Sequence, residues 1–473
     1  MRAVSGCGDR ARRRDRRGPA GKRGLGATLQ TAVAHEIETL VGDGAVDGWD
    51  LEALETAARR QALRVAACAV QARLNADTSD HRGPSLPCAC GRSARYVDRR
   101  AKRFQSVLGA LVLERAYYHC TACQAGFCPR DRALGLSRSS LSPGVLRMVG
   151  LVGAMVSFEE GHAWLHELAG VDVPTTHVER AAEALGREIA AHERTVVEAP
   201  PSGEPVPPTR YLGMDGTGVP VRTAEVVGRA GKQPDGSAKT REVKLCTVWS
   251  AEGRDTDGTP RRDAGSVTYS AAIESAAQTD TAATPSAFAA RVVREATRRG
   301  CDRARRRVVL GDGAPWIWHL ADAHLPEAIQ IVDRFHAKQH LADVAKSLYG
   351  ATSDLAHPWA RARHDELDTG NLDAVLTALR GHAPHNDEAR KCIDYLERNR
   401  ARMDDPAFRA AGLCTSTGVV EAGCKVAIGT RCKRAGMHWT VAGADAIIAL
   451  RCCTLSGRFE DFWERRAQLR LAA

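Results

Sequence analysis

A proline-rich segment divides the sequence into two parts of different character. It reads EAPPSGEPVPPT, residues 198–209, and five of its twelve residues are proline. Proline lacks a backbone donor and interrupts both helices and central strands. Before this segment, apolar residues mostly recur at three- and four-residue steps, which is typical of helices; after it, strand-like and helix-like runs alternate. The segment therefore predicts a linker within a chain of several domains.

The part after the linker predicts an α/β fold. RYLGMDGTGVPV is interpreted as a strand, a turn and a second strand, and EVKLCTVWS as a third strand. Helix, strand, helix, strand and helix then follow as TPSAFAARVVREATRRG, RRVVLGD, APWIWHLADAHL, AIQIVD and HAKQHLADVAKSLYG. This order predicts a mixed sheet that opens antiparallel and continues parallel.

Two Asp-Gly pairs follow predicted strands of this sheet, at Asp215 and Asp312. Asp-Gly is a common turn signal, so either pair alone favours a plain turn. Open α/β sheets bind ligands at the carboxyl ends of their strands, and two such ends would bring the carboxylates together. Because neighbouring carboxylates repel, the pair predicts bound Mg²⁺ or Mn²⁺, with two ions clamping the oxygens of a phosphoryl displacement.

Glu421 is the candidate for a third carboxylate of that site. It lies in TSTGVVEAGCK, after a glycine-containing loop and at the start of a predicted helix that would pack on the sheet. A glutamate that simply favours the positive end of a helix dipole is an equally good interpretation.

Four ordered blocks resemble the ISKra-type bacterial insertion-sequence transposases. They read YLGMDGTGVP, GDGAPWIWHLAD, IQIVDRFHAKQHL and GVVEAGCKVAIGTRCKRAGMHWTVAGADAIIALRCC, and the resemblance spans about residues 84–465. It implies a ribonuclease-H-like core in which Asp215, Asp312 and Glu421 form the catalytic metal triad. Asp333 and His336 are similar to the Asp-x-x-His signature of Mutator-like transposases, which implies that they support the site or contact a DNA strand; a helix-capping Asp with a partly buried His is the alternative.

The resemblance also implies that the polar helical stretch 350–412 is an insertion that holds the transposon end. Basic residues beside an aromatic residue follow Glu421 and suit a DNA backbone near the metals. These DNA-binding candidates are Lys425, Arg431, Lys433, Arg434, His438 and Trp439. A solvated helix face with Trp439 in the core is the alternative.

Two cysteine pairs flank a predicted hairpin that turns at Gly109. Cys88 and Cys90 precede the hairpin, and Cys120 and Cys123 follow it. Four thiolates in two close pairs predict a structural zinc site in a zinc-ribbon-like unit, although the first pair is one residue shorter than the usual C-x-x-C. Unpaired thiols are the alternative. The scattered cysteines as a whole predict a reducing compartment.

Two helices predicted on either side of Gly170 resemble a helix-turn-helix DNA-binding domain. The second helix carries Arg180 and Arg187, which are its candidate DNA contacts.

The net charge of +10 is concentrated at the N-terminus. Residues 1–23 hold nine Arg and Lys against two Asp, which is +7 of the total. Such a segment predicts a disordered basic tail, which contacts phosphates or is merely solvated. No apolar run approaches the roughly 18 residues that a membrane span needs, so we expect a cytoplasmic, nucleoid-associated bacterial protein without a membrane partner.

The predicted organisation is a multidomain α/β chain. Its parts are a basic tail (1–26), a helical region (27–82), a zinc-ribbon-like unit (83–136), a helix-turn-helix domain (137–197), a linker (198–209), a ribonuclease-H-like core (210–349), a helical insertion (350–412) and the Glu-bearing helix that completes the core (413–473).

The predicted function is that of a transposase that binds terminal inverted repeats and target DNA as a homodimer or higher oligomer. It would cleave and join strands by metal-dependent hydrolysis and transesterification. A ribonuclease-H-fold nuclease or resolvase without strand transfer and a non-catalytic DNA-binding regulator are the alternatives. An ATP-binding protein of the actin and sugar-kinase type fits weakly, because a second glycine-rich phosphate loop is not found.

Overall fold

The structure is a computed structural model that describes residues 30–31, 33–38, 50–137, 139–231, 233–256, 258–276 and 283–472. The chain divides into two compact units. The first comprises Met1–Leu146, Trp164–Val173 and Ala467–Ala473, and the second comprises Arg147–Ala163 and Pro174–Arg466. The predicted basic tail, residues 1–26, lies outside the described residues.

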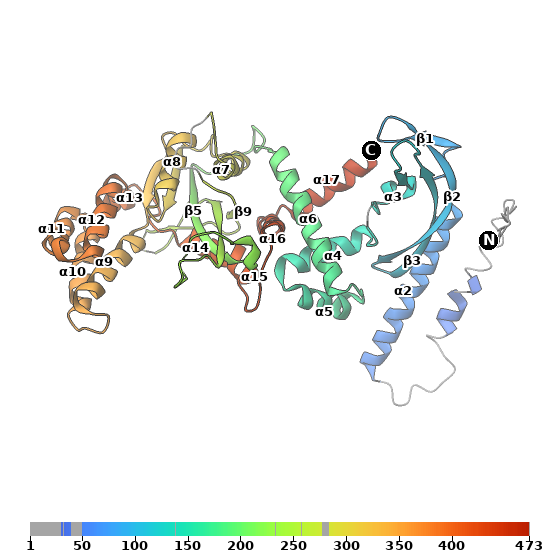
Figure 1. Cartoon of the computed structure of the whole chain (residues 1–473), viewed down its shortest axis with the longest axis horizontal. Helices are drawn as coiled ribbons and strands as arrows, with labels where there is room; N and C mark the ends of the chain where they lie inside the picture. Colours follow the sequence, from blue (N-terminus) through green and yellow to red (C-terminus); the bar gives the residue numbers. More distant parts are fainter. Residues whose placement is uncertain are drawn as a thin grey trace, which may run out of the picture. The chain divides into compact units, whose positions relative to one another are not determined.

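The first unit contains a long helix and an antiparallel sheet (Figure 1). Helix α2 (Leu51–Ala76) begins at Asp50, whose side chain accepts a hydrogen bond from the backbone N–H of Ala53 at 2.8 Å. The sheet has the order β1-β2-β3-β4, and a short helix follows it. These elements are β1 (Ser85–Pro87), β2 (Ser93–Ser106), β3 (Gly109–His119), β4 (Gly126–Phe127) and α3 (Pro129–Ala133).

The hairpin of β2 and β3 confirms the prediction for this stretch. Gly109 has a φ of +109°, which favours glycine, and starts β3 directly after the turn. One small core at the cysteine end of the hairpin contains Ala94, Ala116 and Tyr118. A second core around Phe104 packs against α2. The sheet is therefore stabilised by α2 at one end and by little apolar area at the other.

Three helices connect this region to the large sheet: α4 (Pro143–Met155), α5 (Phe158–Ala169) and α6 (Thr175–Thr195). The predicted break at Gly170 is present, with a φ of +66°. The buried side of α6 packs against α16 (Val441–Leu455), in the second unit. Helix α6 thus belongs to the same compact unit as the large sheet, and the predicted boundary at 198–209 does not coincide with the division between the units.

The large sheet has five strands in the order β11-β10-β5-β6-β9. Its strands are β5 (Thr209–Pro220), β6 (Thr240–Trp249), β9 (Thr268–Ala272), β10 (Arg306–Gly311) and β11 (Ile329–Val332). Strands β5, β6 and β9 form an antiparallel meander, and β10 and β11 add in parallel beside β5. The predicted antiparallel opening and parallel continuation are confirmed. A 3₁₀ turn and a small ribbon lie in the connections: η1 (Thr223–Glu225), β7 (Gly253–Arg254) and β8 (Pro260–Arg261).

The predicted turn at Asp215-Gly216 is wrong. Strand β5 continues without interruption to Pro220, and Asp215 and Gly216 pair with Leu245 and Lys244 of β6. Pairing with β6 along the whole strand holds these residues extended, and it overrides the local preference of Asp-Gly for a turn. The third strand of the meander is therefore β9, which the sequence did not predict.

Helices cover both faces of this sheet. On one face, α7 (Ala287–Arg298) and α8 (Pro315–His324) pack on alternate strand residues such as Leu212, Met214 and Val309. The opposite face presents Tyr211, Val308, Leu310 and Ile331. It is covered by α14 (Gly418–Gly423), its π-helical continuation η4 (Cys424–Gly429) and α16, and α15 (Thr430–Cys432) follows η4. This alternation is that of a sheet buried on both sides.

A group of helices lies beyond the β11 edge of the sheet (Figure 1). It consists of α9 (Arg334–Tyr349), α10 (Ala356–Asp368), α11 (Leu372–His382), η2 (Ala383–His385), α12 (Asp387–Asn399), η3 (Arg400–Arg402) and α13 (Asp405–Ala410). The helical character predicted for 350–412 is confirmed. The chain ends with α17 (Phe459–Ala472). None of the helices in the described ranges combines the length and apolar character that crossing a bilayer requires.

The contact between α6 and α16 gives a prediction for stability. A Cβ at Gly186 would overlap the carbonyl oxygen of Ala446. We expect Gly186→Ala to lower the free energy of unfolding by about 1–3 kcal/mol, because the two helices would have to separate. Gly381→Ala in α11 is the matched control: nothing lies within 4 Å of its Cβ, and we expect a gain of about 0.4–1 kcal/mol. Thermal unfolding by circular dichroism compares them, and equal melting temperatures would contradict the prediction.

Candidate functional site

Three acidic residues lie at the same end of three neighbouring strands of the sheet, β11, β10 and β5. Asp333 directly follows β11 and Asp312 directly follows β10. Pairing between β10 and β5 ends at Leu310 and Gly213, so Asp312 and Asp215 each lie two residues beyond the last pair. Residues two apart on a strand share a face. Because a Cβ at Gly213 would contact Val420 of α14, Asp215 is on the face that α14 covers.

Hydrogen bonds on both sides of Glu421 attach α14 to this edge. Before the helix, the backbone N–H of Thr417 donates to Asp333 Oδ2 at 2.9 Å, and the Thr417 hydroxyl contacts the same oxygen and lies 3.0 Å from Glu421 Oε1. After it, the Cys424 thiol donates to Asp215 Oδ2 at 3.3 Å. Glu421 is therefore held between the outer two of the three strand ends.

Each of the three aspartates also accepts a hydrogen bond from a nearby backbone N–H group. The first carboxylate oxygen of Asp215 accepts from Gly216 at 2.6 Å, that of Asp312 from Ala314 at 2.9 Å, and that of Asp333 from Phe335 at 2.8 Å. The second oxygen of Asp215 and of Asp333 faces α14. Among the described residues, the second oxygen of Asp312 receives no hydrogen bond, so it is free to bind a ligand.

Electrostatics at this edge favour a cation. Burial raises the pKa of the Asp215 carboxyl, and the charge of the nearby Asp312 raises it further. Burial and the Asp215 carboxylate also raise the pKa of the Cys424 thiol, so it stays protonated and donates its hydrogen bond at neutral pH. Two neighbouring carboxylates with a free oxygen fit a hard divalent cation such as Mg²⁺ or Mn²⁺, which prefers oxygen ligands.

Glu421 also lies close to the other two predicted residues. Its Oε1 is 3.3 Å from His336 Nε2. The ligand atoms of Asp333, His336 and Glu421 all lie within 4.8 Å of one another, a spacing at which they could hold one ion, whereas Asp215 and Asp312 belong to no such group among the described residues. The structure thus brings Glu421 to Asp333 and His336, and brings Asp215 beside Asp312. Asp333 is also the N-cap of α9, so the helix-capping alternative describes its geometry as well.

Two residues of this arrangement were not predicted from the sequence, Thr417 and Cys424. Thr417 lies four residues before Glu421 and Cys424 three residues after it. Residues at these spacings share one side of a helix. That spacing is a signal from which both could have been found.

The basic residues after Glu421 divide by exposure. Lys425, Lys433, Arg434 and His438 are exposed. Arg431 and Trp439 are buried, which corrects their prediction as DNA contacts: the Arg431 guanidinium lies 4.6 Å from the ring centroid of Phe158 and 5.1 Å from that of Trp439. Its Nε donates to the carbonyl of Gly153 at 3.0 Å. These two residues pack α15 against the end of α4 and offer no surface to DNA.

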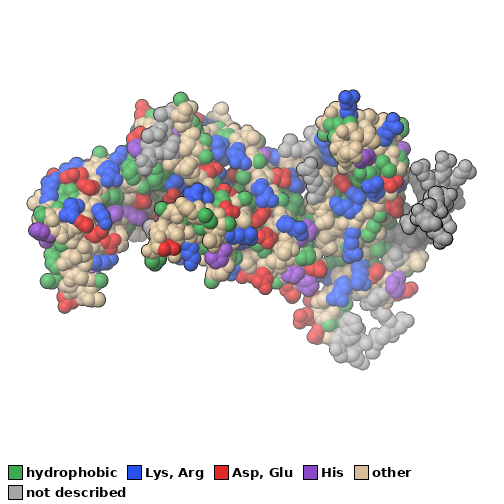
Figure 2. Space-filling view, in the orientation of Figure 1, with side chains coloured by type: hydrophobic (Ala, Val, Ile, Leu, Met, Phe, Trp, Pro, Cys, Tyr) green, Lys and Arg blue, Asp and Glu red, His purple; other side chains and the backbone are tan. Residues whose placement is uncertain are grey.

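Two of these exposed cations have partners within the chain. Lys433 contacts the Thr217 hydroxyl, two residues beyond Asp215, and Arg434 pairs with Glu160. On α6, both predicted contacts are exposed: Arg180 Nε donates to the Thr176 carbonyl at 3.2 Å, and Arg187 pairs with Glu183 at 3.3 Å. On the face drawn in Figure 2, Lys and Arg are interspersed with Asp and Glu. Charge alone therefore defines no DNA-binding face in this view.

The four predicted cysteines lie together in the first unit. Cys88, Cys90, Cys120 and Cys123 have sulfur atoms that all lie within 4.8 Å of one another. The Cys88–Cys123 and Cys90–Cys120 sulfur distances are 3.6 and 3.7 Å, close to the roughly 3.8 Å edge of a tetrahedron with zinc–sulfur bonds of about 2.3 Å. Backbone N–H groups of Cys123 and Ala122 lower the pKa of Cys120 to about 7, which favours a thiolate, while the neighbouring thiols raise the pKa of Cys123 to about 12. The donor set fits zinc.

Comparison with known proteins gives little further information. No protein-family model matches the chain, and no curated protein matches it. Among solved structures, the chain has a likeness to the Drosophila P element transposase strand transfer complex, with 10% sequence identity and a TM-score of 0.24, over 72% of this chain and 84% of that chain. At this TM-score the likeness bears on neither fold nor function.

The cysteine cluster gives a prediction for metal content. We expect the purified protein to contain zinc and Cys120→Ser to lose it, because three thiolates and a hydroxyl bind zinc less tightly than four thiolates. The β2–β3 hairpin, with its small core, should then become sensitive to protease. Cys128→Ser is the control, since Cys128 is half-buried and outside the cluster. Metal analysis and limited proteolysis measure both effects; a protein free of zinc with a protease-resistant hairpin would contradict the prediction.

The Thr417 contacts give a prediction for stability. Thr417→Val keeps the backbone hydrogen bond to Asp333 but removes the hydroxyl between two carboxylates. Because the buried Asp333 carboxylate then has one donor fewer, we expect the free energy of unfolding to fall by about 1–3 kcal/mol. Thr454→Val is the control, because the Thr454 hydroxyl only donates to the Leu450 carbonyl within α16. Thermal unfolding compares the variants, and a melting temperature of Thr417→Val at or above that of the control would refute this role.

Proposed function

We propose that this chain is a DNA transposase whose metal-dependent site cleaves phosphodiester bonds and joins DNA strands. The observation that carries the proposal is the attachment of α14 across the strand ends, with Thr417 on Asp333 and Cys424 on Asp215. Glu421 lies on this helix between its two attachments, and we infer that it shares bound metal with Asp215 and Asp312, the residues that the sequence singled out for the same chemistry.

The topology supports this proposal. An antiparallel meander with two parallel strands added beside its first strand agrees with the ribonuclease-H-like core implied by the resemblance to ISKra-type transposases. In such open sheets, ligands bind beyond the carboxyl ends of the parallel strands. The helices from α10 to α13 occupy the position of the proposed insertion, between β11 and the Glu-bearing helix.

The residues of the site would have distinct roles. Asp215, Asp312 and Glu421 would hold two Mg²⁺ or Mn²⁺ ions, which when bound polarise a phosphate and stabilise the charge that develops in phosphoryl transfer. Asp333 positions Thr417 and, through it, the start of α14. Cys424 orients Asp215 by donating to its second oxygen. His336 contacts Glu421 and restricts its side chain.

The DNA would contact exposed cations around this site and in the N-terminal half. The proposed contacts are Lys425, Lys433, Arg434 and His438 near Glu421, and Arg180 and Arg187 on α6. The zinc-binding hairpin would assist in holding the transposon ends, and the protein would act as a dimer or higher oligomer on DNA. All these contacts would be to phosphates or bases and would weaken with salt.

Substitution of Asp312 tests the proposal. Asp312→Asn keeps the size of the side chain and its hydrogen bond from Ala314, but removes the charge that binds metal. We expect metal-dependent cleavage of DNA carrying the element's ends to slow by at least about a hundredfold, with DNA affinity unchanged. Cleavage in Mg²⁺ and binding in Ca²⁺ measure the two separately.

Asp322→Asn is the matched control, because Asp322 is exposed on α8, ten residues along the chain from Asp312. Its cleavage rate should equal that of the unmodified protein. Strand transfer is measured with pre-cleaved ends, which supply the 3′-hydroxyl. Mg²⁺-dependent cleavage that survives Asp312→Asn would refute the site, and cleavage without strand transfer would identify a nuclease.

A further inference from the structure

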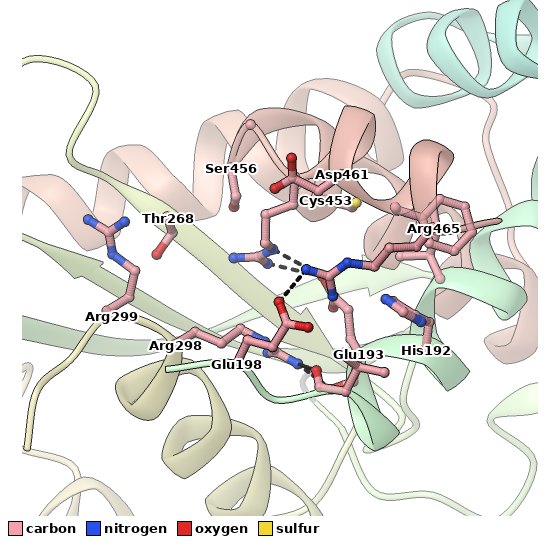
Figure 3. A pocket seen from close by; sticks show the side chains of 15 residues that line it. His192, Glu193, Glu198, Thr268, Arg298, Arg299, Cys453, Ser456, Asp461 and Arg465 are labelled. Atoms are coloured by element: carbon pink, nitrogen blue, oxygen red, sulfur yellow. Dashed lines mark hydrogen bonds and ion pairs between the residues drawn. The ribbon is translucent and has the colours of Figure 1, made fainter. Parts of the chain in front are cut away.

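Two cavities of the second unit differ in whether the charged side chains that line them are paired within the protein. The cavity in Figure 3, of about 300 Å³, lies among α6, α7, β9 and α17 and is rich in arginine. Two of its arginines are paired with carboxylates: Arg458 lies 3.1 Å from Glu193 and 3.0 Å from Glu295, and Arg465 pairs with Glu198. A third, Arg299, donates to the Ser266 carbonyl at 3.0 Å. This cavity is the interior of an ion-pair network and has little free charge for a ligand.

The other cavity, of about 680 Å³, adjoins the carboxylate site. We call it the Phe335 cavity. Its lining includes Trp249, Arg262, Arg334, Phe335, Arg409 and Ser416. The loop that carries Thr417 and the first turn of α14 form one wall, and the start of α9, beside His336, forms another. Its volume lies in the range of small-ligand sites.

The charge of the Phe335 cavity is positive. Of the described residues, three arginines and no carboxylate line it. Arg334 is held by Asp368 and Asp405, at 3.6 and 3.7 Å, whereas Arg262 is exposed and forms no ion pair with the described residues. Arg409 uses Nη2 for the Asp368 carbonyl at 2.9 Å. Arg262 and the rest of the Arg409 guanidinium are therefore available to an anion, for which Arg is well suited.

The cavity also presents an aromatic face. The Phe335 side chain is 53% exposed although it is large and apolar. Trp249, also in the lining, is fully buried and stacks on Tyr211. Together the walls suit a ligand that is anionic and aromatic.

We propose that the Phe335 cavity binds one unstacked nucleotide of a DNA strand held at the carboxylates. The base would stack on Phe335, and the phosphate would lie at Arg262 and Arg409. The volume holds one nucleotide and excludes a duplex, so the nucleotide must leave its stack to enter. This inference rests on the proposed function for the presence of DNA, but binding tests it without cleavage.

The experiment compares three DNA probes in Ca²⁺, without Mg²⁺. They are a blunt duplex, the same duplex with a single-stranded oligodeoxyadenylate overhang, and the duplex with an overhang of abasic residues, which keeps the phosphates but lacks the bases. We expect the protein to bind the adenine overhang about tenfold more tightly than the abasic one, because stacking of a base on an aromatic side chain contributes an effect of this size.

Substitutions then assign that difference to the cavity. Phe335→Leu should abolish the preference for bases, and Phe335→Tyr should keep it. Arg262→Ala should weaken binding of both overhangs equally. Arg261→Ala is the matched control, because Arg261 is the adjacent exposed cation and does not line the cavity. As a second measurement, an overhang with 5-iododeoxyuridine should crosslink on irradiation to the peptide that contains Phe335.

Three results would overturn the inference: equal affinity for the adenine and abasic overhangs, a base preference that survives Phe335→Leu, or a crosslink outside the cavity. Deoxyadenosine monophosphate that binds as tightly as the overhang would identify a site for free nucleotides and would also overturn it. Cleavage in Mg²⁺ is assayed separately. Base preference without cleavage would refute the proposed function alone, and cleavage without base preference would refute the Phe335 cavity alone.

Discussion

The hydrogen bonds between Thr417 and Asp333 hold the start of α14, and with it Glu421, at the end of the sheet. Asp333 is only 1% exposed, so its charge needs donors, and the backbone of Thr417 supplies one at 2.9 Å. Helix α14 has only six residues, too few to be stable without tertiary contacts. Its π-helical continuation has more residues per turn than an α-helix, which rotates Arg431 away from the side that carries Cys424. One stretch of helix can therefore contact Asp215 with one residue and dock on α4 with another.

The sequence was sufficient to predict the order of most elements around the site. Alternating apolar runs predicted the strands that precede Asp215, Asp312 and Asp333, and the structure contains them. It was insufficient where pairing between distant segments overrides local preference. Asp215-Gly216 has the composition of a turn, yet β6 holds it in an unbroken strand. The contacts of Thr417 with Asp333 and of Cys424 with Asp215 span 84 and 209 residues, and such contacts leave no trace in local periodicity.

The burial of certain arginines was also not predictable from the sequence. Arg431 follows Glu421 closely and is flanked by other cations, so its composition predicts a DNA contact. In the structure its guanidinium is fully buried between two aromatic rings and donates to a backbone carbonyl. Arg451 is similar, because it donates to the carbonyls of Ala154 and Val426. Arginine is rarely buried without acceptors for its donors, and these backbone acceptors come from segments that only the fold brings near. The Arg431 Nη2 has no acceptor among the described residues.

One loop connects the carboxylate site with the Phe335 cavity. Thr417 faces Asp333 and Glu421, while its neighbours Ser416 and Gly418 line the cavity. Consecutive residues of the same segment thus serve the two sites, and α9 repeats this division with His336 beside Glu421 and Phe335 in the cavity. A displacement of the loop would change both sites together. A nucleotide in the cavity would consequently have a fixed position relative to Glu421, because the contacts that hold the carboxylate also form the wall against which the nucleotide rests.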